Sequence, residues 1–490
     1  MRSLTLLSVL FPILAGSALL AWRPQDRRTR NRYVLGAVLV GAALVLGCAL
    51  ASIRLGPEAL AFHAASLSRH LVLAFRPDGP ALVFGAIIGV LWPVTTVYAL
   101  SYMDHEGREN LFFGFFLITF GVVAGIAYSA NFFTLYLNYE FMTLVTLPLV
   151  MHGMDAKSRY AGKLYVLYSM TGAALIFICL MVLCRYTESL DFVYGGILDP
   201  ALAAGHERML HTVFVLAFFG FGVKAAIFPF HRWLPAASVA PTPVTALLHA
   251  VAVVKAGAFA VMRLIYYGFG CGFLRGTPAQ TLAMLFCAVT IVYGSARALR
   301  TPHLKRRLVY STIANLSYIL LAFASMDGLG LTAGLLHMIF HAVVKITLFF
   351  CAGAILHHTG LEYVYELEGF GYRMPLTCAL FTVSGIALVG IPPFGNFLSK
   401  WLTASAAAAN GGWGGHLGTA ALIASAGLAM LYTQGITVRL YFPLRSAPAL
   451  PDRIHEADRL ITGPLVALTA MLALLSLFSF PLETWIGGLL

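Results

Sequence analysis

Charged residues are scarce in this sequence, and their scarcity excludes a soluble globular protein. Only 11% of the 490 residues are Asp, Glu, Lys or Arg, whereas 60% are hydrophobic. The longest polar connections, around residues 54–80, 185–209 and 442–460, are too short to build a core of their own. The composition is therefore that of a membrane protein that crosses the bilayer many times.

Motifs for cofactor and metal chemistry are missing as well. The seven cysteines are scattered, mainly through apolar segments, without a Cys-x-x-Cys pair, which argues against an iron–sulfur cluster and against a zinc site. The sequence contains no HExxH pattern, no nucleotide-binding loop and no arrangement for a catalytic nucleophile. We therefore expect no cofactor and no metal, and we expect any redox reaction coupled to this chain to take place elsewhere.

The net charge of +12 is explained by membrane topology better than by a nucleic-acid partner. Basic residues fall mostly in short loops beside apolar runs, and four of these loops are expected on one side of the membrane. They contain Arg23 to Arg32, Lys157 to Lys163, Arg297 to Arg307 and Arg439 to Arg459. The positive-inside rule makes that side cytoplasmic and places both termini on the non-cytoplasmic side of an inner (plasma) membrane.

Hydrophobic runs near the ~20 residues needed to cross the hydrocarbon core predict an all-α fold with about 14 transmembrane helices. The first run, Leu4 to Leu20, is expected to be a retained helix and not a cleaved signal peptide, because one basic residue, Arg2, precedes it while several follow. The expected spans are 3–22, 32–53, 81–102, 111–128, 131–152, 161–184, 210–236, 243–266, 278–297, 306–325, 330–356, 375–408, 417–441 and 461–480.

Spans four to eight and nine to thirteen predict two inverted five-helix repeats. Five is an odd number, so the two sets enter the membrane from opposite sides, and the fourth helix of each is interrupted by proline. These are span seven, with Pro229 and Pro235, and span twelve, with Pro392 and Pro393. Two proline-kinked helices can also occur by chance. The expected division is 1–103 for the N-terminal helices, 104–268 and 269–441 for the repeats, and 442–490 for the C-terminal loop and last helix.

A buried acid and a buried lysine form the first candidate site. Glu140 lies in the apolar run FFTLYLNYEFM, and Lys224 lies in an equally apolar run further along the chain. Lone buried charges need partners, and opposite signs make each the natural partner of the other. Movement of the carboxylate relative to the lysine would change the proton affinity of the lysine, which is a workable proton switch. A static pair that locks two helices together is the alternative.

Histidines and further lysines continue the pattern. His249 and Lys255 are six residues apart, so a shuttle between them is plausible but not forced by helical geometry. His337, His341 and Lys345 are spaced by four and four, which stacks them on one helix face and suits proton relay. Structural hydrogen bonding and a metal site are the alternatives, although no nearby carboxylate or cysteine completes a metal site.

Lys400 closes the series as a candidate terminal proton site. It follows the interruption Gly-Ile-Pro-Pro-Phe-Gly, which should free backbone carbonyls for water or for a lysine. The alternative is a lysine that reaches to the membrane interface, which the neighbouring Trp401 favours. Asp78, ahead of span three, is expected to be an ordinary helix cap.

The segments that carry these residues resemble a known family. Lys224 to Pro235 reads KAAIFPFHRWLP, Ala240 to Ala250 reads APTPVTALLHA, and Lys255-Ala256-Gly257 follows. Together they are similar to the signature of the antiporter-like subunits of respiratory complex I, of Mrp-type cation/proton antiporters and of membrane-bound hydrogenases. The resemblance extends from about Asp78 to Lys400.

This resemblance implies a line of ionisable groups along the membrane midplane and a proton-translocating subunit without redox chemistry of its own. In this scheme Glu140 pairs with Lys224, and Lys255, with His249 beside it, is the next proton site. One of His337, His341 or Lys345 follows. Lys400 is the terminal site, where some relatives carry glutamate. A charge change in a neighbouring subunit would separate Glu140 from Lys224 and drive the proton toward Lys400.

The resemblance also implies partners. They would be other membrane subunits, including homologous antiporter-like ones, of an oxidoreductase or hydrogenase complex. We expect no long lateral helix after the last span, in contrast to one large relative. The alternatives are Na⁺/H⁺ exchange in an Mrp-type antiporter, which the scarcity of acidic residues in the spans disfavours, and a stand-alone transporter of an organic solute, which would need a larger polar pocket.

Overall fold

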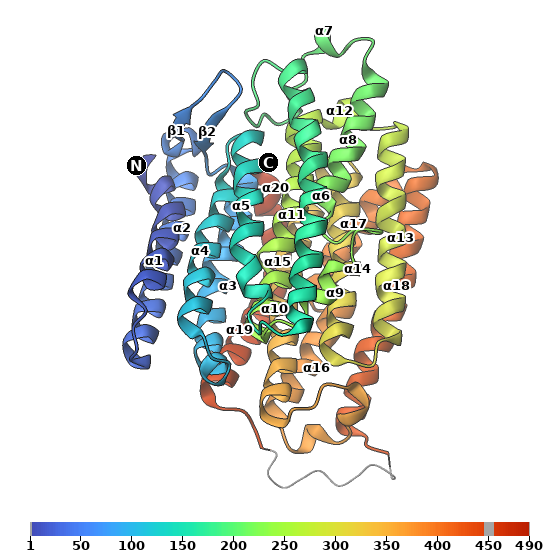
Figure 1. Cartoon of the computed structure of the whole chain (residues 1–490). Coiled ribbons are helices and arrows are strands. Elements are labelled where there is room, and N and C mark those ends of the chain that lie inside the picture. Colours follow the sequence, from blue (N-terminus) through green and yellow to red (C-terminus); the bar gives the residue numbers. More distant parts are fainter. Residues whose placement is uncertain (1, 445–454, 490) are drawn as a thin grey trace.

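The structure is a computed structural model that describes residues 2–444 and 455–489, and it is a bundle of long helices (Figure 1). Twelve helical segments in the described part of the chain are long and apolar enough to cross a membrane. The predicted all-α membrane class is thus confirmed. The unbroken long helices are α1 Arg2–Trp22, α2 Arg27–Leu55, α3 Gly79–Tyr102, α4 Glu109–Tyr128, α5 Phe132–Val150, α6 Ala156–Tyr186, α13 Pro278–Arg300, α14 Leu304–Ala324, α15 Gly328–Thr359, α18 Gly412–Tyr441 and α19 Arg459–Leu477.

Three of the expected spans are broken. The predicted interruptions of spans seven and twelve are present, because the proline-containing segments cannot continue a helix. Span eight is also interrupted, at Val251 and Ala252, which the hydropathy pattern does not predict. The broken spans consist of α8 Glu207–Gly222 with α9 Trp233–Ala237, α10 Thr242–Ala250 with α11 Val253–Arg263, and α16 Pro375–Val389 with α17 Gly395–Asn410. The inverted repeat itself stays a prediction.

The remaining elements are short and connect the long helices. Two strands pair in antiparallel fashion with Phe62 opposite Phe75, and this hairpin was not expected from the sequence. The short elements are β1 Phe62–Ser66, β2 Val72–Phe75, α7 Pro200–Ala203, α12 Cys271–Leu274 and α20 Ser479–Gly488, the 3₁₀ turns η1 Pro57–Leu60, η2 Met103–His105, η4 Val364–Glu366 and η5 Phe370–Tyr372, and the π-helical turn η3 Leu264–Phe269.

Helix α15 lies inside the bundle, packed against α10, α14, α16, α17 and α19. The segment from Thr242 to Phe269, which carries Lys255, is buried throughout. Small residues permit close packing elsewhere: a Cβ on Gly172 of α6 would lie 2.7 Å from the carbonyl oxygen of Gly220 of α8. The fold therefore places Lys255, His337, His341 and Lys345 far from water.

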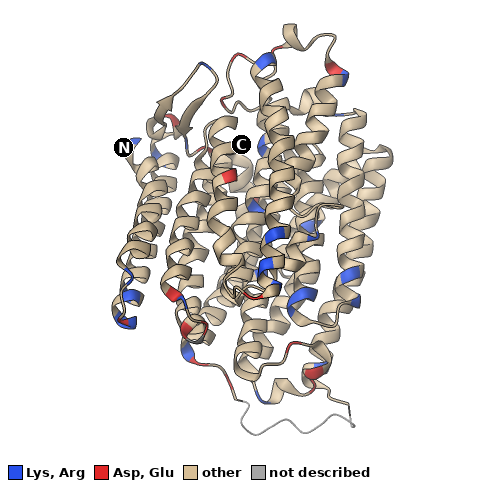
Figure 2. Ribbon diagram, in the orientation of Figure 1, with Lys and Arg blue, Asp and Glu red and all other residues tan. Residues whose placement is uncertain are grey.

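Many charged residues lie toward the ends of the helices, and several Lys and Arg lie in the middle of the bundle (Figure 2). Both termini lie in the upper half of Figure 1, and the arginine-rich turn between α1 and α2 lies at the opposite end. The termini thus share one side, as the span count predicts, whereas the identity of that side stays a prediction. Arg445 and Arg453 of the fourth basic loop lie outside the described residues.

Candidate functional site

Lys224 lies in the break that follows α8. Its ammonium group donates to the backbone carbonyl of Tyr139 on α5 and lies 3.5 Å from the centre of the Tyr139 ring. The Tyr139 hydroxyl in turn donates to the carbonyl of Phe221 at 2.9 Å. Tyr139 therefore holds the break from two directions, and its ring and carbonyl supply the negative potential that a buried ammonium needs.

Glu140, the partner that the sequence predicts for Lys224, is adjacent to this contact but not in direct contact with the ammonium group. Within the described residues, no acidic side chain lies within 4 Å of the Lys224 ammonium, and the buried Glu140 Oε1 has no hydrogen-bond partner. The reason is helical geometry, because neighbouring residues of α5 point in directions about 100° apart and Tyr139 is the one that faces the break. The two charges still influence each other electrostatically.

Helix α11 packs directly on the broken segment. A Cβ on Gly257 would lie 2.6 Å from the backbone nitrogen of Ala225 and 2.9 Å from the carbonyl carbon of Lys224. Only glycine permits this approach without a shift of one backbone. The contact brings the helix that carries Lys255 next to the segment that carries Lys224.

Lys255 is bonded to His341 and not to His249. Its ammonium group lies within hydrogen-bonding distance of His341 Nδ1 on α15, and both side chains are fully buried. The His249 ring packs against Phe349 with ring centres 5.3 Å apart, and neither of its nitrogens has a partner. The break at Val251 and Ala252 separates the two residues that a continuous helix would have placed on neighbouring faces.

The series continues along α15 and crosses to α17. The rings of His341 and His337 are stacked, with centres 5.9 Å apart, as the spacing of four predicts. His337 Nδ1 is 2.9 Å from the hydroxyl oxygen of Ser399, the residue before Lys400. The Nε2 atoms of both histidines are buried without partners. An unpartnered imidazole nitrogen can accept or release a proton when a donor or a water molecule comes within reach.

Lys345 lies on the same helix but points toward α14. Its ammonium group donates to the carbonyl of Leu308 at 3.0 Å and to the hydroxyl of Ser311. It makes no hydrogen bond to His341. Lys345 is thus not part of the series of contacts from Lys255 through His341 and His337 to Ser399.

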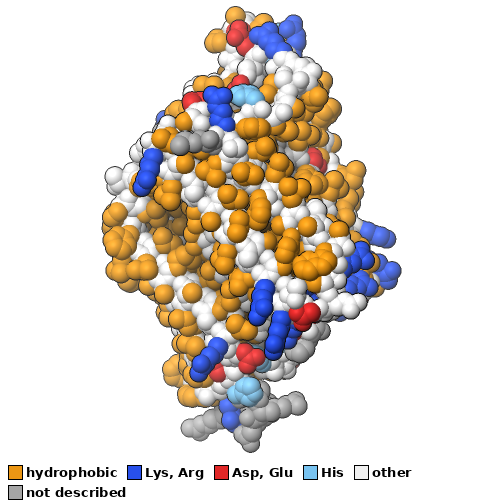
Figure 3. Space-filling view, turned by 90° about the vertical axis from the view of Figure 1, so that its left-hand side faces the viewer, with side chains coloured by type: hydrophobic (Ala, Val, Ile, Leu, Met, Phe, Trp, Pro, Cys, Tyr) orange, Lys and Arg blue, Asp and Glu red, His pale blue; other side chains and the backbone are white. Residues whose placement is uncertain are grey.

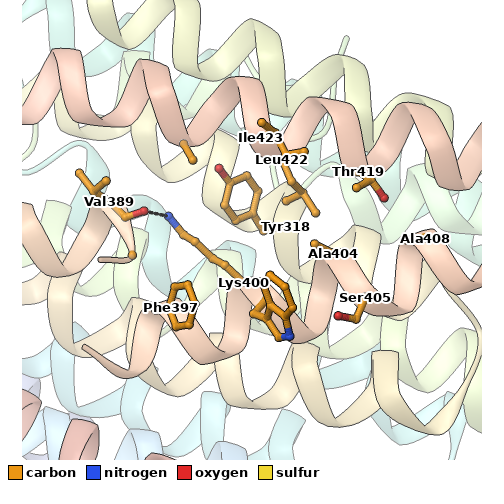
Figure 4. A pocket seen from close by; sticks show the side chains of 13 residues that line it. Tyr318, Val389, Phe397, Lys400, Ala404, Ser405, Ala408, Thr419, Leu422 and Ile423 are labelled. Carbon is orange, nitrogen blue, oxygen red and sulfur yellow. Dashed lines mark hydrogen bonds between the residues drawn. The ribbon is translucent and has the colours of Figure 1, made fainter. Parts of the chain in front are cut away.

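Lys400 uses the carbonyls that the break in span twelve frees, as the sequence predicts. Its ammonium group donates to the carbonyls of Leu388 at 2.6 Å and Val389 at 2.9 Å, and lies 5.1 Å from the centre of the Tyr318 ring. The side chain borders an apolar cavity of about 460 Å³ between α17 and α18 (Figure 4). The ammonium thus points to the helix break and away from Trp401, so this contact does not favour the alternative of an interfacial lysine.

A polar cavity of about 330 Å³ opens at the end of the bundle that carries the basic loops. Glu106, His303, Lys305 and Glu362 line part of it. Burial lowers the pKa of His303, and the charge of Glu362, whose Oε2 lies 3.5 Å from His303 Nε2, opposes that shift. Lys305 is buried and donates to the carbonyl of Ala240 at 3.0 Å, so polar groups extend from this cavity into the bundle.

Several residues of the candidate site are not predicted from the sequence. Ser399, Ser311 and Tyr318 are common residue types in any helix, and their only signal is their closeness in space to a lysine or a histidine. Asn396 is fully buried, with both amide atoms unpartnered, one turn before Lys400.

Asp78 is a cap of α3, as predicted, but it does more. Its carboxylate also accepts two hydrogen bonds, at 2.5 and 2.7 Å, from the buried Arg263 of α11. Only the structure brings these two residues together, because they are 185 positions apart.

No group of three or more His, Cys, Asp or Glu side chains is placed to hold a metal ion within residues 2–444 and 455–489. The groups that meet inside the bundle are lysines, histidines, hydroxyls and backbone carbonyls. These groups can bind and pass protons, and the lysine and histidine donors do not compose a site for a hard cation.

Comparisons with known proteins identify the family of this chain. The sequence profile of the family described as "NADH:quinone oxidoreductase/Mrp antiporter, TM" matches residues 129–425. NADH-quinone oxidoreductase subunit N of Desulforudis audaxviator is 31% identical over 430 residues, which cover 85% of this chain and 83% of that protein. A protein of Rhizobium meliloti described as a probable K⁺/H⁺ antiporter subunit is 31% identical over 394 residues, 79% of this chain but 38% of that protein. The chain thus spans well under half the length of that relative.

Two solved structures share the fold. A chain of the membrane-bound sulfane sulfur reductase, an archaeal respiratory membrane complex, superposes with a TM-score of 0.86 at 22% identity, and the match covers 100% of this chain and 98% of that one. A chain of the Mrp complex from Dietzia sp. superposes with a TM-score of 0.84 at 20% identity, with coverage of 100% and 96%.

Proposed function

The chain belongs to the NADH:quinone oxidoreductase/Mrp antiporter family, and from that premise we propose that it is a proton-translocating, antiporter-like subunit of a multisubunit membrane complex. The complex would be a respiratory or hydrogenase assembly related to complex I. Other membrane subunits, homologous ones among them, are the proposed partners, and the energy comes from a redox module outside this chain.

One observation carries the proposal. Lys255, His341, His337 and Ser399 connect α11, α15 and α17 through fully buried side chains, and Lys400 follows directly in the chain. Groups that titrate or reorient readily follow one another across the membrane interior, where isolated ionisable residues are costly and normally functional. A purely structural role would not require so many basic groups without acidic partners.

The proton switch lies at the other end of this series. Lys224 is held by the carbonyl and ring of Tyr139, and Glu140 lies beside it with an unpartnered oxygen. Movement of α5 or of the broken segment would bring the carboxylate toward the ammonium or away from it, which changes the proton affinity of Lys224. A proton released there passes through water to Lys255, whose helix is held against the Lys224 segment by the Gly257 contact, and then toward Lys400.

The proposed orientation follows from the basic loops. With those loops in the cytoplasm, both termini lie on the outer side of the plasma membrane. The polar cavity at Lys305 then opens toward the cytoplasm.

Proton translocation by the purified native assembly in proteoliposomes tests the proposal. Lys224→Ala should abolish translocation at matched turnover while the complex stays intact, whereas Lys163→Ala, which changes an exposed lysine of α6, should leave it unchanged. Unchanged translocation in Lys224→Ala would contradict the proposal. Translocation that depends on a sodium gradient in the wild type would favour Na⁺/H⁺ exchange instead.

A further inference from the structure

Helices α1 and α2 form the outer edge of the bundle (Figure 1). They enclose a groove between them. The groove has a volume of about 500 Å³, and small residues, Ala15, Ala18, Gly36 and Ala37, make it hollow. Leu14 and Val40 border it and are 64% and 47% exposed. On this face of the molecule hydrophobic side chains cover the middle, and Lys and Arg lie toward the ends and edges (Figure 3).

Tyr33 fixes the wall of the groove at its arginine-rich end. Its hydroxyl donates to the carbonyl of Ala15 at 2.9 Å, and its ring packs edge-on against Trp22 with ring centres 5.7 Å apart. The groove is thus a feature of the folded helix pair, because a hydrogen bond between the two helices holds the side chain that closes it.

Four arginines at this end divide into two pairs, and a fifth, Arg23, donates to the carbonyl of Leu20 at 2.9 Å. Arg27 is bound to Asp104, and Arg30 Nη1 lies 3.4 Å from Glu109 Oε2. Arg28 and Arg32 are exposed, one helical turn apart, and neither lies within 4 Å of a carboxylate in the described residues. Arg32 itself lines the groove. The apolar groove thus ends near two exposed guanidinium groups, of which Arg28 also influences the Asp26 carboxylate electrostatically.

We propose that this groove binds an anionic phospholipid, with one acyl chain between α1 and α2 and the phosphate at Arg28 and Arg32. The groove is apolar along its length and cationic at one end, which complements a molecule with a long tail and an anionic head. Guanidinium groups bind phosphate oxygens in a forked geometry, and clusters of basic residues at the end of a transmembrane helix attract anionic lipids. A neighbouring helix would fill the apolar part but would leave both arginines without an anion.

The acyl-chain site and the phosphate site can be tested by separate substitutions. Gly36 lines the groove, and a Cβ at this position meets no protein atom within 4 Å, so Gly36→Leu places its side chain in the groove. Gly47, on the same helix, also has open space around it but does not line the groove, so Gly47→Leu is the matched control. The double substitution Arg28→Gln with Arg32→Gln removes the head site, and Arg54→Gln at the opposite end of α2 is its control.

The experiment measures phosphatidylglycerol and phosphatidylcholine that remain bound to the purified native complex after detergent washing, by mass spectrometry. The wild type and both controls should retain a phosphatidylglycerol molecule that Gly36→Leu and the double arginine variant lose. Equal retention of the two lipids, or retention unchanged in both variants, would overturn the proposal. The proposal would also be overturned if inorganic phosphate stabilised the washed complex against heat as much as phosphatidylglycerol vesicles do. It would be overturned, too, if Gly36→Leu lost a partner subunit without any change in bound lipid.

Discussion

The buried lysines are stabilised in different ways in two regions of the molecule, the first half of the series around Lys224 and the second half from Lys255 to Lys400. Around Lys224 a carboxylate, Glu140, lies close by, whereas the groups from Lys255 to Lys400 within the described residues are all basic or neutral. In the second half the ammonium of Lys400 is bound by freed backbone carbonyls, and that of Lys255 by an imidazole. Helix breaks and histidines thus replace an acid.

The difference has a physical consequence for the proposed relay. A carboxylate carries a full negative charge, so its position sets the proton affinity of a nearby lysine over a wide range. Carbonyl dipoles and neutral imidazoles compensate a positive charge only in part. Two adjacent protons in the second half would repel each other strongly, so we expect this half to carry protons singly and the first half to decide when one is released.

Of the three substitutions that test this comparison, Lys255→Met should reduce proton translocation most. It removes the side chain that connects α11 with His341, and methionine fills the buried space without a charge. We expect proton translocation to fall by more than about 10-fold, because a proton-transfer group typically contributes that much or more. The measurement is the ratio of protons translocated to turnover in proteoliposomes. A normal ratio would mean that the two halves are connected by another route.

Glu140→Gln tests the role of the acid. It keeps the shape of the side chain and removes its charge, so the proton affinity of Lys224 loses its adjustable component. Since the two groups are not in contact, we expect an effect of about 1 kcal/mol, or roughly fivefold in translocation rate. Glu140→Asp should retain most of the rate. If Glu140→Gln pumped as well as the wild type, the first half would not differ from the second in mechanism.

Ser399→Ala should have the smallest effect. The substitution removes the hydroxyl that bonds to His337 between α15 and α17, but a water molecule can occupy its place. We expect a reduction of roughly twofold, near the lower limit for the loss of one hydrogen bond. Ser405→Ala, on the same helix but in the lining of the cavity beside Lys400, serves as the control. A loss as large as that of Lys255→Met would show that Ser399 itself carries the proton.

Most of the site could be predicted because ionisable residues are conspicuous in apolar segments. Lys224, Lys255, His337, His341 and Lys400 were all recognisable in this way, and the proline breaks at spans seven and twelve were visible too. The pairing of Glu140 with Lys224 stays a prediction: the two charges influence each other, but the sequence does not specify which of two adjacent residues on α5 touches the lysine, and that residue is Tyr139. The spacing of His249 and Lys255 does not force a shuttle between them, and the break of span eight, which the sequence does not predict, explains why the two are not joined.

The sequence by itself determined that this is a many-spanning membrane protein with basic groups inside, since hydropathy and charge act locally and need no knowledge of contacts. Only the tertiary structure decided which of those groups meet. Lys255 and His341 are 86 positions apart, and Lys224 is 85 positions from Tyr139. Their contacts depend on how the helices cross and on close approaches such as the one at Gly257, which no local sequence pattern encodes.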